Sequence, residues 1–222
     1  MKKYAHILSK CPLFSGIEEE SLVSLLGCLG AKITCFEKKY TIMAEGSAAK
    51  YIGVMLQGSA QIVQVDYYGN RTILSEVVAG DIFGEAFACA GVEEIPVSVV
   101  ANEFCEVMLI DSYCILHSCS NACGFHQQMI FNLMKNLAAK NIAFHQKIEI
   151  TSKRTTREKL MTYLLMQAKK YDSDSFTIPF KRQELADYLE VDRSGLSAEI
   201  SKLRQEGIVE SERSSFKLLR QY

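Results

Sequence analysis

The sequence predicts an α+β fold in three parts: an N-terminal antiparallel β-roll of the jelly-roll type, a long central helix, and a small C-terminal helical domain with two short strands. Three observations support this. Short β-rich runs separated by glycines fill residues 33–110, the longest helical pattern runs from about residue 125 to 150, and two apolar stripes at helical spacing follow within residues 180–209. We expect the parts to span residues 1–124, 125–151 and 152–222, a chain long enough for two small domains.

The pattern of the N-terminal part predicts a short helical segment that precedes the roll. Residues 4–29 carry a short amphipathic helical pattern, interrupted at Pro12 and Gly16. The β-rich runs that follow are typical of a compact antiparallel roll or barrel. A metal-dependent enzyme on such a roll would need imidazole ligands, and there is no histidine between residues 7 and 116. We therefore expect no catalytic site in the roll.

The central pattern predicts a helix that pairs with a second copy of the chain. Apolar residues and one asparagine recur four and three apart, the spacing of a coiled-coil seam; they are Ile130, Met134, Leu137, Asn141, Phe144 and Ile148. A buried amide at Asn141 is best satisfied by its twin across a two-fold axis. We expect a homodimer through this seam, and the alternative is a helix that packs only on its own roll.

The last part predicts two packed helices and a wing. One stripe is formed by Leu185, Ala186 and Leu189, and the second by Leu196, Ile200 and Leu203. Asp192 is a good N-cap for the second helix, and Gly207 suits the position just after its end. Residues 208–211 and 216–219, separated by a polar turn, predict a two-stranded wing. The pattern is that of a winged helix-turn-helix.

Residues 182–186, RQELA, followed by residues 191–194, VDRS, strongly resemble the CRP/FNR family of bacterial transcription regulators. The resemblance covers nearly the whole chain from Pro12 to Leu219. It implies a DNA-binding regulator without enzymatic activity, with a sensor roll and a central dimerisation helix. It also implies a palindromic operator and RNA polymerase as partners.

The exposed face of the second helix predicts which residues contact DNA. Opposite the apolar stripe, this face would meet base edges in the major groove, and Arg193 is the one long donor on its first turn. Ser194 and Ser197 would assist, Arg182 and Lys202 would mainly hold phosphates, and Gln183 joins the expected set. Residues 149–222 contain 14 Lys+Arg against 12 Asp+Glu, so affinity must come from a few well-placed contacts and from dimerisation. The alternative is a ligand-binding or scaffold protein whose winged domain contacts protein; Ala198 favours it, because many relatives carry an arginine there.

The expected effector pocket departs from the family pattern. Residues 80–85, which end in Gly84 and Glu85, are similar to the segment that leads into the phosphate cassette of cyclic-nucleotide-binding rolls. Alignment places Ile95 and Pro96 where the family has an Arg-Ser or Arg-Thr pair, and Ile142 and Ala143 where cyclic-AMP binders present hydroxyls to adenine. Neither pair offers the donors that a cyclic nucleotide needs. The effector is therefore unknown, cyclic AMP is not expected, and an apolar or organic ligand is favoured.

The lack of an export signal predicts a cytoplasmic protein, and the cysteines suggest a second hypothetical site. The sequence shows no export signal and no run of 18 apolar residues, so neither export nor a membrane span is expected. Its 8 cysteines are then more typical of free thiols, ligands or sensors than of disulfides. On a helix, Cys119, Cys123 and His126 would follow at successive turns, a hypothetical metal or redox-sensing site. The alternative is core packing, with Gly124 breaking the helix before His126.

Overall fold

The computed structural model describes residues 2–69, 71–117 and 124–219. The chain forms two compact units, Met1–Ala139 and Lys140–Tyr222. The two units meet within the long helix α5 (Gly124–Thr151). The predicted boundaries at residues 124 and 151 coincide with the ends of this helix, and the division into three parts stays a prediction. In the described part of the chain, no helix combines the length and apolarity that crossing a membrane requires.

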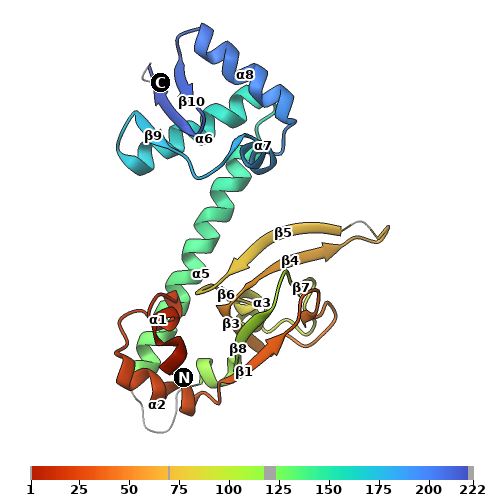
Figure 1. Ribbon diagram of the computed structural model, residues 1–222, viewed down its shortest axis with the longest axis vertical. Helices are drawn as coiled ribbons and strands as arrows, with labels where there is room; N and C mark the ends of the chain where they lie inside the picture. The colour runs from red at the N-terminus through yellow and green to blue at the C-terminus, as the bar shows by residue number, and fades with distance from the viewer. Residues whose placement is uncertain (1, 70, 118–123, 220–222) are drawn as a thin grey trace. The chain divides into compact units, whose positions relative to one another are not determined.

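The N-terminal unit is built on two four-stranded antiparallel sheets, shown in Figure 1. One sheet has the strand order β1-β8-β3-β6 and the other the order β2-β7-β4-β5. The strands are β1 (Lys32–Phe36), β2 (Thr41–Met43), β3 (Tyr51–Gln57), β4 (Ser59–Val65), β5 (Arg71–Val78), β6 (Ile82–Phe83), β7 (Ser98–Ala101) and β8 (Cys105–Asp111). The predicted antiparallel roll is confirmed.

The roll closes around an apolar core, and one glycine allows its tightest contact. Strand β3 is buried along its five central residues, as expected of a strand covered on both faces. A Cβ atom at Gly53 would lie 2.3 Å from the Phe83 ring, so the ring can pack on β3 only because residue 53 has no side chain. Any other residue at position 53 would displace Phe83 from the core.

Short helices flank the roll and attach the beginning of α5 to it. They are η1 (Lys2–Tyr4), α1 (Ala5–Leu8), η2 (Pro12–Phe14), α2 (Glu19–Cys28), α3 (Glu85–Ala90) and α4 (Ser112–Leu116). The buried amide of Asn132 on α5 donates to the carbonyl oxygens of Leu13 (3.1 Å) and Ser15 (2.7 Å). Since these carbonyls end a 3-10 turn and have no ladder partner, Asn132 satisfies them and orients the helix.

The C-terminal unit packs three helices against a small sheet. Its elements after α5 are α6 (Thr156–Tyr171), β9 (Ser175–Thr177), α7 (Arg182–Leu189), α8 (Arg193–Gln205), β10 (Val209–Glu212) and β11 (Ser215–Leu218). A capping box starts α6, in which the Thr155 hydroxyl accepts from the Glu158 N–H and the Glu158 carboxylate accepts from the Thr155 N–H. The predicted wing is confirmed as β10 and β11, and a third strand that the pattern did not predict, β9, pairs with β11.

Candidate nucleic-acid interface

The turn between α7 and α8 sets the direction in which α8 leaves it. The Asp192 carboxylate accepts from the Gly195 N–H at 2.9 Å and from the Ser194 hydroxyl. Hydrogen bonds from Ser194 and then Gly195 lower the pKa of Asp192, because they stabilise its charged form. Asp192 is thus the N-cap that the sequence predicts, while the donor of Ser194 points into the cap.

Helix α8 has one buried and one exposed face. Leu196, Ile200 and Leu203 are buried in the core of the C-terminal unit, as predicted. Arg193, Ala198 and Ser201 are exposed on the other side, with Ser197 half-buried beside them. The exposed face is mainly polar and begins with Arg193, whose guanidinium the structure leaves without a salt bridge to any described residue.

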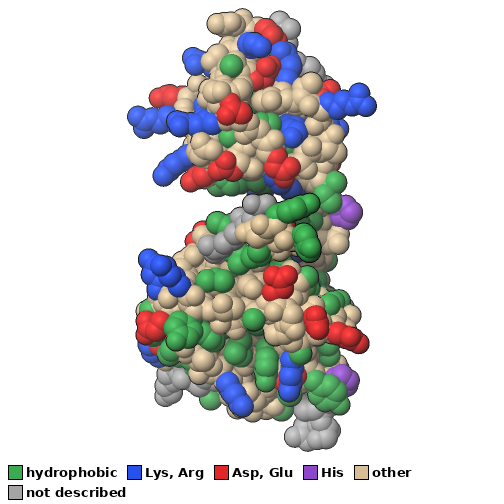
Figure 2. Space-filling view, turned by 90° about the vertical axis from the view of Figure 1, so that its right-hand side faces the viewer, with side chains coloured by type: hydrophobic (Ala, Val, Ile, Leu, Met, Phe, Trp, Pro, Cys, Tyr) green, Lys and Arg blue, Asp and Glu red, His purple; other side chains and the backbone are tan. Residues whose placement is uncertain are grey.

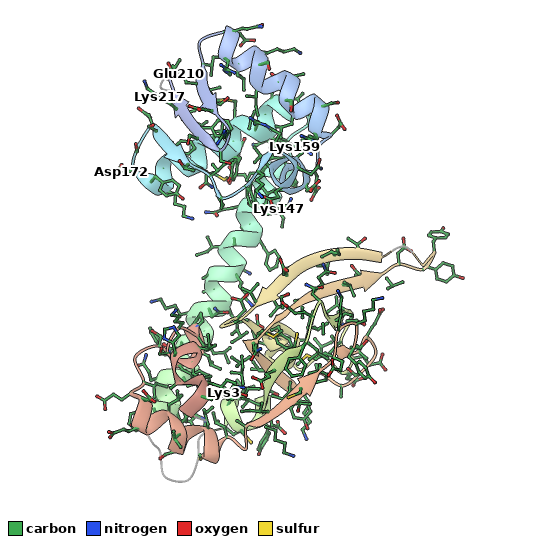
Figure 3. The ribbon with its side chains drawn as sticks, in the orientation of Figure 1. Lys3, Lys147, Lys159, Asp172, Glu210 and Lys217 are labelled. Carbon is green, nitrogen blue, oxygen red and sulfur yellow. The ribbon has the colours of Figure 1, made fainter. Side chains whose placement is uncertain are left out.

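Two lysines from other helices hold the turn that precedes α8. Glu190 has a left-handed backbone with φ 53°, an uncommon conformation for a residue with a side chain. The ammonium of Lys147, at the end of α5, donates to the Tyr188 carbonyl oxygen and lies 3.3 Å from the Glu190 carboxylate. Lys159 on α6 donates to the Glu190 carbonyl oxygen at 3.2 Å. Figure 3 labels both lysines near this turn, which neither periodicity nor capping rules predicted.

An ion network fixes the far end of α8 on α6. Arg157 donates to Glu206 at 3.0 Å and to Glu199 at 3.4 Å through the same nitrogen, Nη1. Lys202 lies 3.8 Å from the other oxygen of Glu199. The Lys202 ammonium, expected on a phosphate, is therefore paired with an acid in the free protein, at a distance and exposure where such a pair is weak.

The residues predicted at the start of α7 have internal contacts as well. Arg182 is half-buried, its guanidinium lies 5.9 Å from the centroid of the Phe216 ring, and burial lowers its pKa. Its Nη1 atom is buried without a hydrogen-bond partner among the described residues. The exposed Gln183 donates to Asp187 at 2.8 Å.

Cationic side chains stand out from the surface of the C-terminal unit, with acidic ones between them (Figure 2). On the wing, for example, Lys217 of β11 lies 3.6 Å from Glu210 of β10. This mixed pattern agrees with the small basic excess of the sequence and favours discrete phosphate contacts over a broad positive field.

The expected effector residues of the roll have contrasting surroundings. Gly84 adopts φ 77° ahead of α3, and the Glu85 side chain that follows is buried. Ile95 is 4% exposed and belongs to the same apolar cluster as Phe83, while Pro96 is exposed. Ile142 and Ala143 are exposed on the part of α5 that belongs to the C-terminal unit.

The residues of the predicted α5 seam fall into two groups that differ in exposure to solvent. Leu137 packs against the core of the N-terminal unit and Ile130 is half-buried. Met134, Asn141, Phe144 and Ile148 are exposed, and so are Phe131 and Ile142 outside the predicted seam. An exposed apolar surface on a long helix is typical of an interface.

The hypothetical metal or redox site can be followed only at His126. Cys119 and Cys123 lie outside the described residues. The imidazole of His126 is buried, and its Nε2 lies 2.9 Å from the Ile115 carbonyl oxygen. Within residues 2–69, 71–117 and 124–219, no group of three or more His, Cys, Asp or Glu side chains is placed to hold a metal.

Two family models match the chain, and each lies within one of the two compact units. A cyclic nucleotide-binding domain matches residues 33–119, and a Crp-like helix-turn-helix domain matches residues 158–220. Among curated proteins, none matches the sequence significantly.

Solved structures show the same fold at low sequence identity. The catabolite activator protein of Thermus thermophilus is 19% identical, with a TM-score of 0.50 over 93% of each chain. The regulator CLP of Xanthomonas campestris, described as c-di-GMP responsive, is 14% identical, with a TM-score of 0.56 over 91% of this chain and all of its own. DNR from Pseudomonas aeruginosa is 17% identical, with a TM-score of 0.52 over 100% of this chain and 96% of its own.

A sensor-type roll, a long helix and a winged helix-turn-helix together define the architecture of a DNA-binding transcription regulator. The chain belongs to the CRP/FNR family of these regulators.

Proposed function

We propose that the chain acts in the cytoplasm as a homodimer that binds a two-fold symmetric DNA site through α8, and that a small apolar molecule or a redox change sensed in the roll controls it. The observation that carries this proposal is the exposed polar face of α8, headed by Arg193 and held in place at both ends of the helix. RNA polymerase would be the partner on the bound operator.

The proposal assigns different roles to the cations of the interface. Arg193 recognises bases, assisted by Ser197 and Ser194, and Gln183 contacts DNA from α7. Arg182 and Lys202 bind phosphates, and the weak pairing of the exposed Lys202 supports its availability. The two copies of α8 in the dimer would enter successive major grooves, so half-sites about one helical turn apart, roughly 10 bp, are expected.

Binding to an operator selected from a random DNA pool tests these roles. Arg193→Ala should lower affinity for the selected site by about 10-fold or more and bring it closer to that for unrelated DNA, since a good base contact contributes about 1–3 kcal/mol of discrimination. Lys202→Ala should weaken binding to all sequences alike and reduce the salt slope by about 1. The matched control is Lys169→Ala, which removes an exposed cation from the last turn of α6. Equal losses for all three variants would contradict the assignment.

The dimer of this proposal uses the exposed apolar residues of α5. Met134, Phe144 and Ile148 are large side chains left in water by a single chain, which supports their burial against a second copy. Asn141 would then pair with its twin. Leu137 and Ile130 contribute less than the heptad pattern implies, because their side chains are already partly buried on their own unit.

The effector site of this proposal is apolar. Ile95 in the core and Pro96, which lacks an N–H, offer no donor to a phosphate, and Gly84 and Glu85 alone cannot replace the missing guanidinium. Ile142 and Ala143 likewise offer no hydroxyl to a base. Titration calorimetry with cyclic AMP should give no saturable heat. Saturable micromolar binding would overturn this part of the proposal, and the DNA-binding experiment would stand independently.

A further inference from the structure

The C-terminal unit contains a cavity of about 260 Å³ that lies apart from the exposed face of α8. Its lining comes from the end of α5, from α6, from the segment before α7 and from α7 itself, all within one compact unit. Neither Arg193 nor any other residue of α8 lines it. The volume is close to the lower end of the range for small-molecule pockets, which suits a single substituted ring.

Aromatic side chains form the inner wall of this cavity. The ring centroids of Phe180 and Tyr188 are 4.9 Å apart, and those of Tyr163 and Tyr188 are 5.4 Å apart. Such walls favour the flat face of another aromatic ring, because offset and edge-to-face contacts add to the burial of apolar area. The cavity is therefore shaped for an aromatic group more than for a sugar or an aliphatic chain.

One polar group in the wall has no partner. The Tyr163 side chain is 2% exposed, and its hydroxyl makes no hydrogen bond to any described residue. A buried hydroxyl without a partner costs about 1–3 kcal/mol, so it is normally satisfied by water or by a ligand. Burial also raises the pKa of Tyr163, so the hydroxyl keeps its proton and acts as a donor.

Lys170 places a positive charge at the opening of the cavity. Lys170 and Tyr171 line the cavity and are exposed, and the Lys170 ammonium lies 5.9 Å from the Tyr171 ring centroid. Among the described residues, none forms a salt bridge with Lys170. The cavity thus presents an aromatic wall, a buried donor and one positive charge at its entrance, without a lining acid.

We propose that this cavity binds a monocyclic aromatic carboxylate, with the ring against Phe180 and Tyr188, the carboxylate at Lys170, and an acceptor on the ring satisfying Tyr163. This inference builds on the proposed function by adding a second regulatory input. Tyr188 lies on α7, its carbonyl oxygen accepts from Lys147, and its ring centroid is 4.6 Å from the same ammonium. A ligand against this ring touches the support of the turn that precedes α8 and so changes DNA affinity.

Calorimetry on the full chain without DNA tests the site, with benzoate, 4-hydroxybenzoate and neutral benzamide as probes. We expect saturable binding of the two acids, tighter for 4-hydroxybenzoate, and weaker binding of benzamide. Lys170→Gln should weaken both acids about 5-fold and leave benzamide unchanged, since a partly screened charge is lost. Lys169→Gln, one residue away and outside this cavity, is the matched control. Tyr163→Phe should remove the advantage of 4-hydroxybenzoate over benzoate.

Three results would overturn the inference: no saturable heat with either acid at millimolar concentration, equal weakening by Lys170→Gln and Lys169→Gln, or binding of 4-hydroxybenzoate that Lys170→Gln leaves intact. Lys170 is exposed, so its variant remains informative even if Tyr163→Phe fails to fold. Failure of the proposed function is distinguishable, because Arg193→Ala should lower affinity for the selected operator by about 10-fold or more and still bind the acids. Operator binding that responds to 4-hydroxybenzoate in the wild type and not in Lys170→Gln supports the regulatory role.

Discussion

Phe144→Ala should weaken the proposed dimer, and the expected loss of association free energy follows from the exposed area of the Phe144 side chain. The Phe144 residue is 68% exposed in a single chain. A phenylalanine buries about 150–250 Å², so roughly 100–170 Å² of each copy remains to be covered. At about 25 cal/mol/Å² this is roughly 2.5–4 kcal/mol per side chain, although association recovers only part of it. We expect a loss of about 3 kcal/mol per dimer, or a rise of roughly 100-fold in the dimer dissociation constant.

Sedimentation equilibrium across a wide concentration range measures this constant. Glu149→Ala is the matched control, because residue 149 is exposed on the same helix and lies about 140° away from residue 144 around its axis. Far-UV circular dichroism should show the same helix content for both variants. A rise below about threefold for Phe144→Ala, or an equal rise for Glu149→Ala, would refute the reasoning that α5 pairs through this surface.

Three further predictions concern the stability and chemistry of the chain. Leu196→Ala, at a fully buried position of α8, should lower the free energy of unfolding by about 2–5 kcal/mol in urea denaturation, whereas Ala198→Ser at an exposed position should change it little. Similar free energies of unfolding for the two variants would contradict the observed burial. Because the pKa of Asp192 is lowered, its stabilising contribution is complete above about pH 4 and is lost as the pH falls through the folded-state value. Asp192→Asn should therefore show a smaller acid-induced loss of stability than the wild type, and an unchanged acid profile would argue against the cap. Burial raises the pKa of Cys11 to about 11, so peptide mapping after iodoacetamide treatment at neutral pH should find Cys11 unmodified while the exposed Cys28 and Cys35 react. Equal labelling of the three cysteines in the folded protein would show that Cys11 is accessible.

Local rules read from the sequence were sufficient for much of the DNA-binding unit. The Asp192 cap, the stripe of Leu196, Ile200 and Leu203, and the left-handed Gly207 after α8 are all observed. Each depends on residues within about one helical turn of one another, so periodicity and capping chemistry predict them without knowledge of the fold. The alternation of short strands and glycines likewise predicted the roll, although not the pairing order of its strands.

Contacts between distant residues were decided only by the tertiary structure. Nothing local to Glu190 indicates that Lys147 and Lys159 hold its turn, and nothing near Glu199 indicates Arg157. The heptad pattern could not separate Leu137, which packs on its own unit, from Phe144, which remains exposed, because one periodicity serves both kinds of burial.

The same limit applies to the wing and to the aromatic cavity. Strand β9 was missed because three residues carry little pattern and take their conformation from pairing with β11. Tyr163, Phe180 and Tyr188 are separated in sequence and form one wall only after α6 and α7 pack. The sequence alone therefore determined α7, α8 and the polar face of α8, since these depend on neighbours along the chain. Tertiary packing decided which cations are already paired, which apolar residues stay exposed and where a cavity remains, because these depend on the side chains that folding brings together.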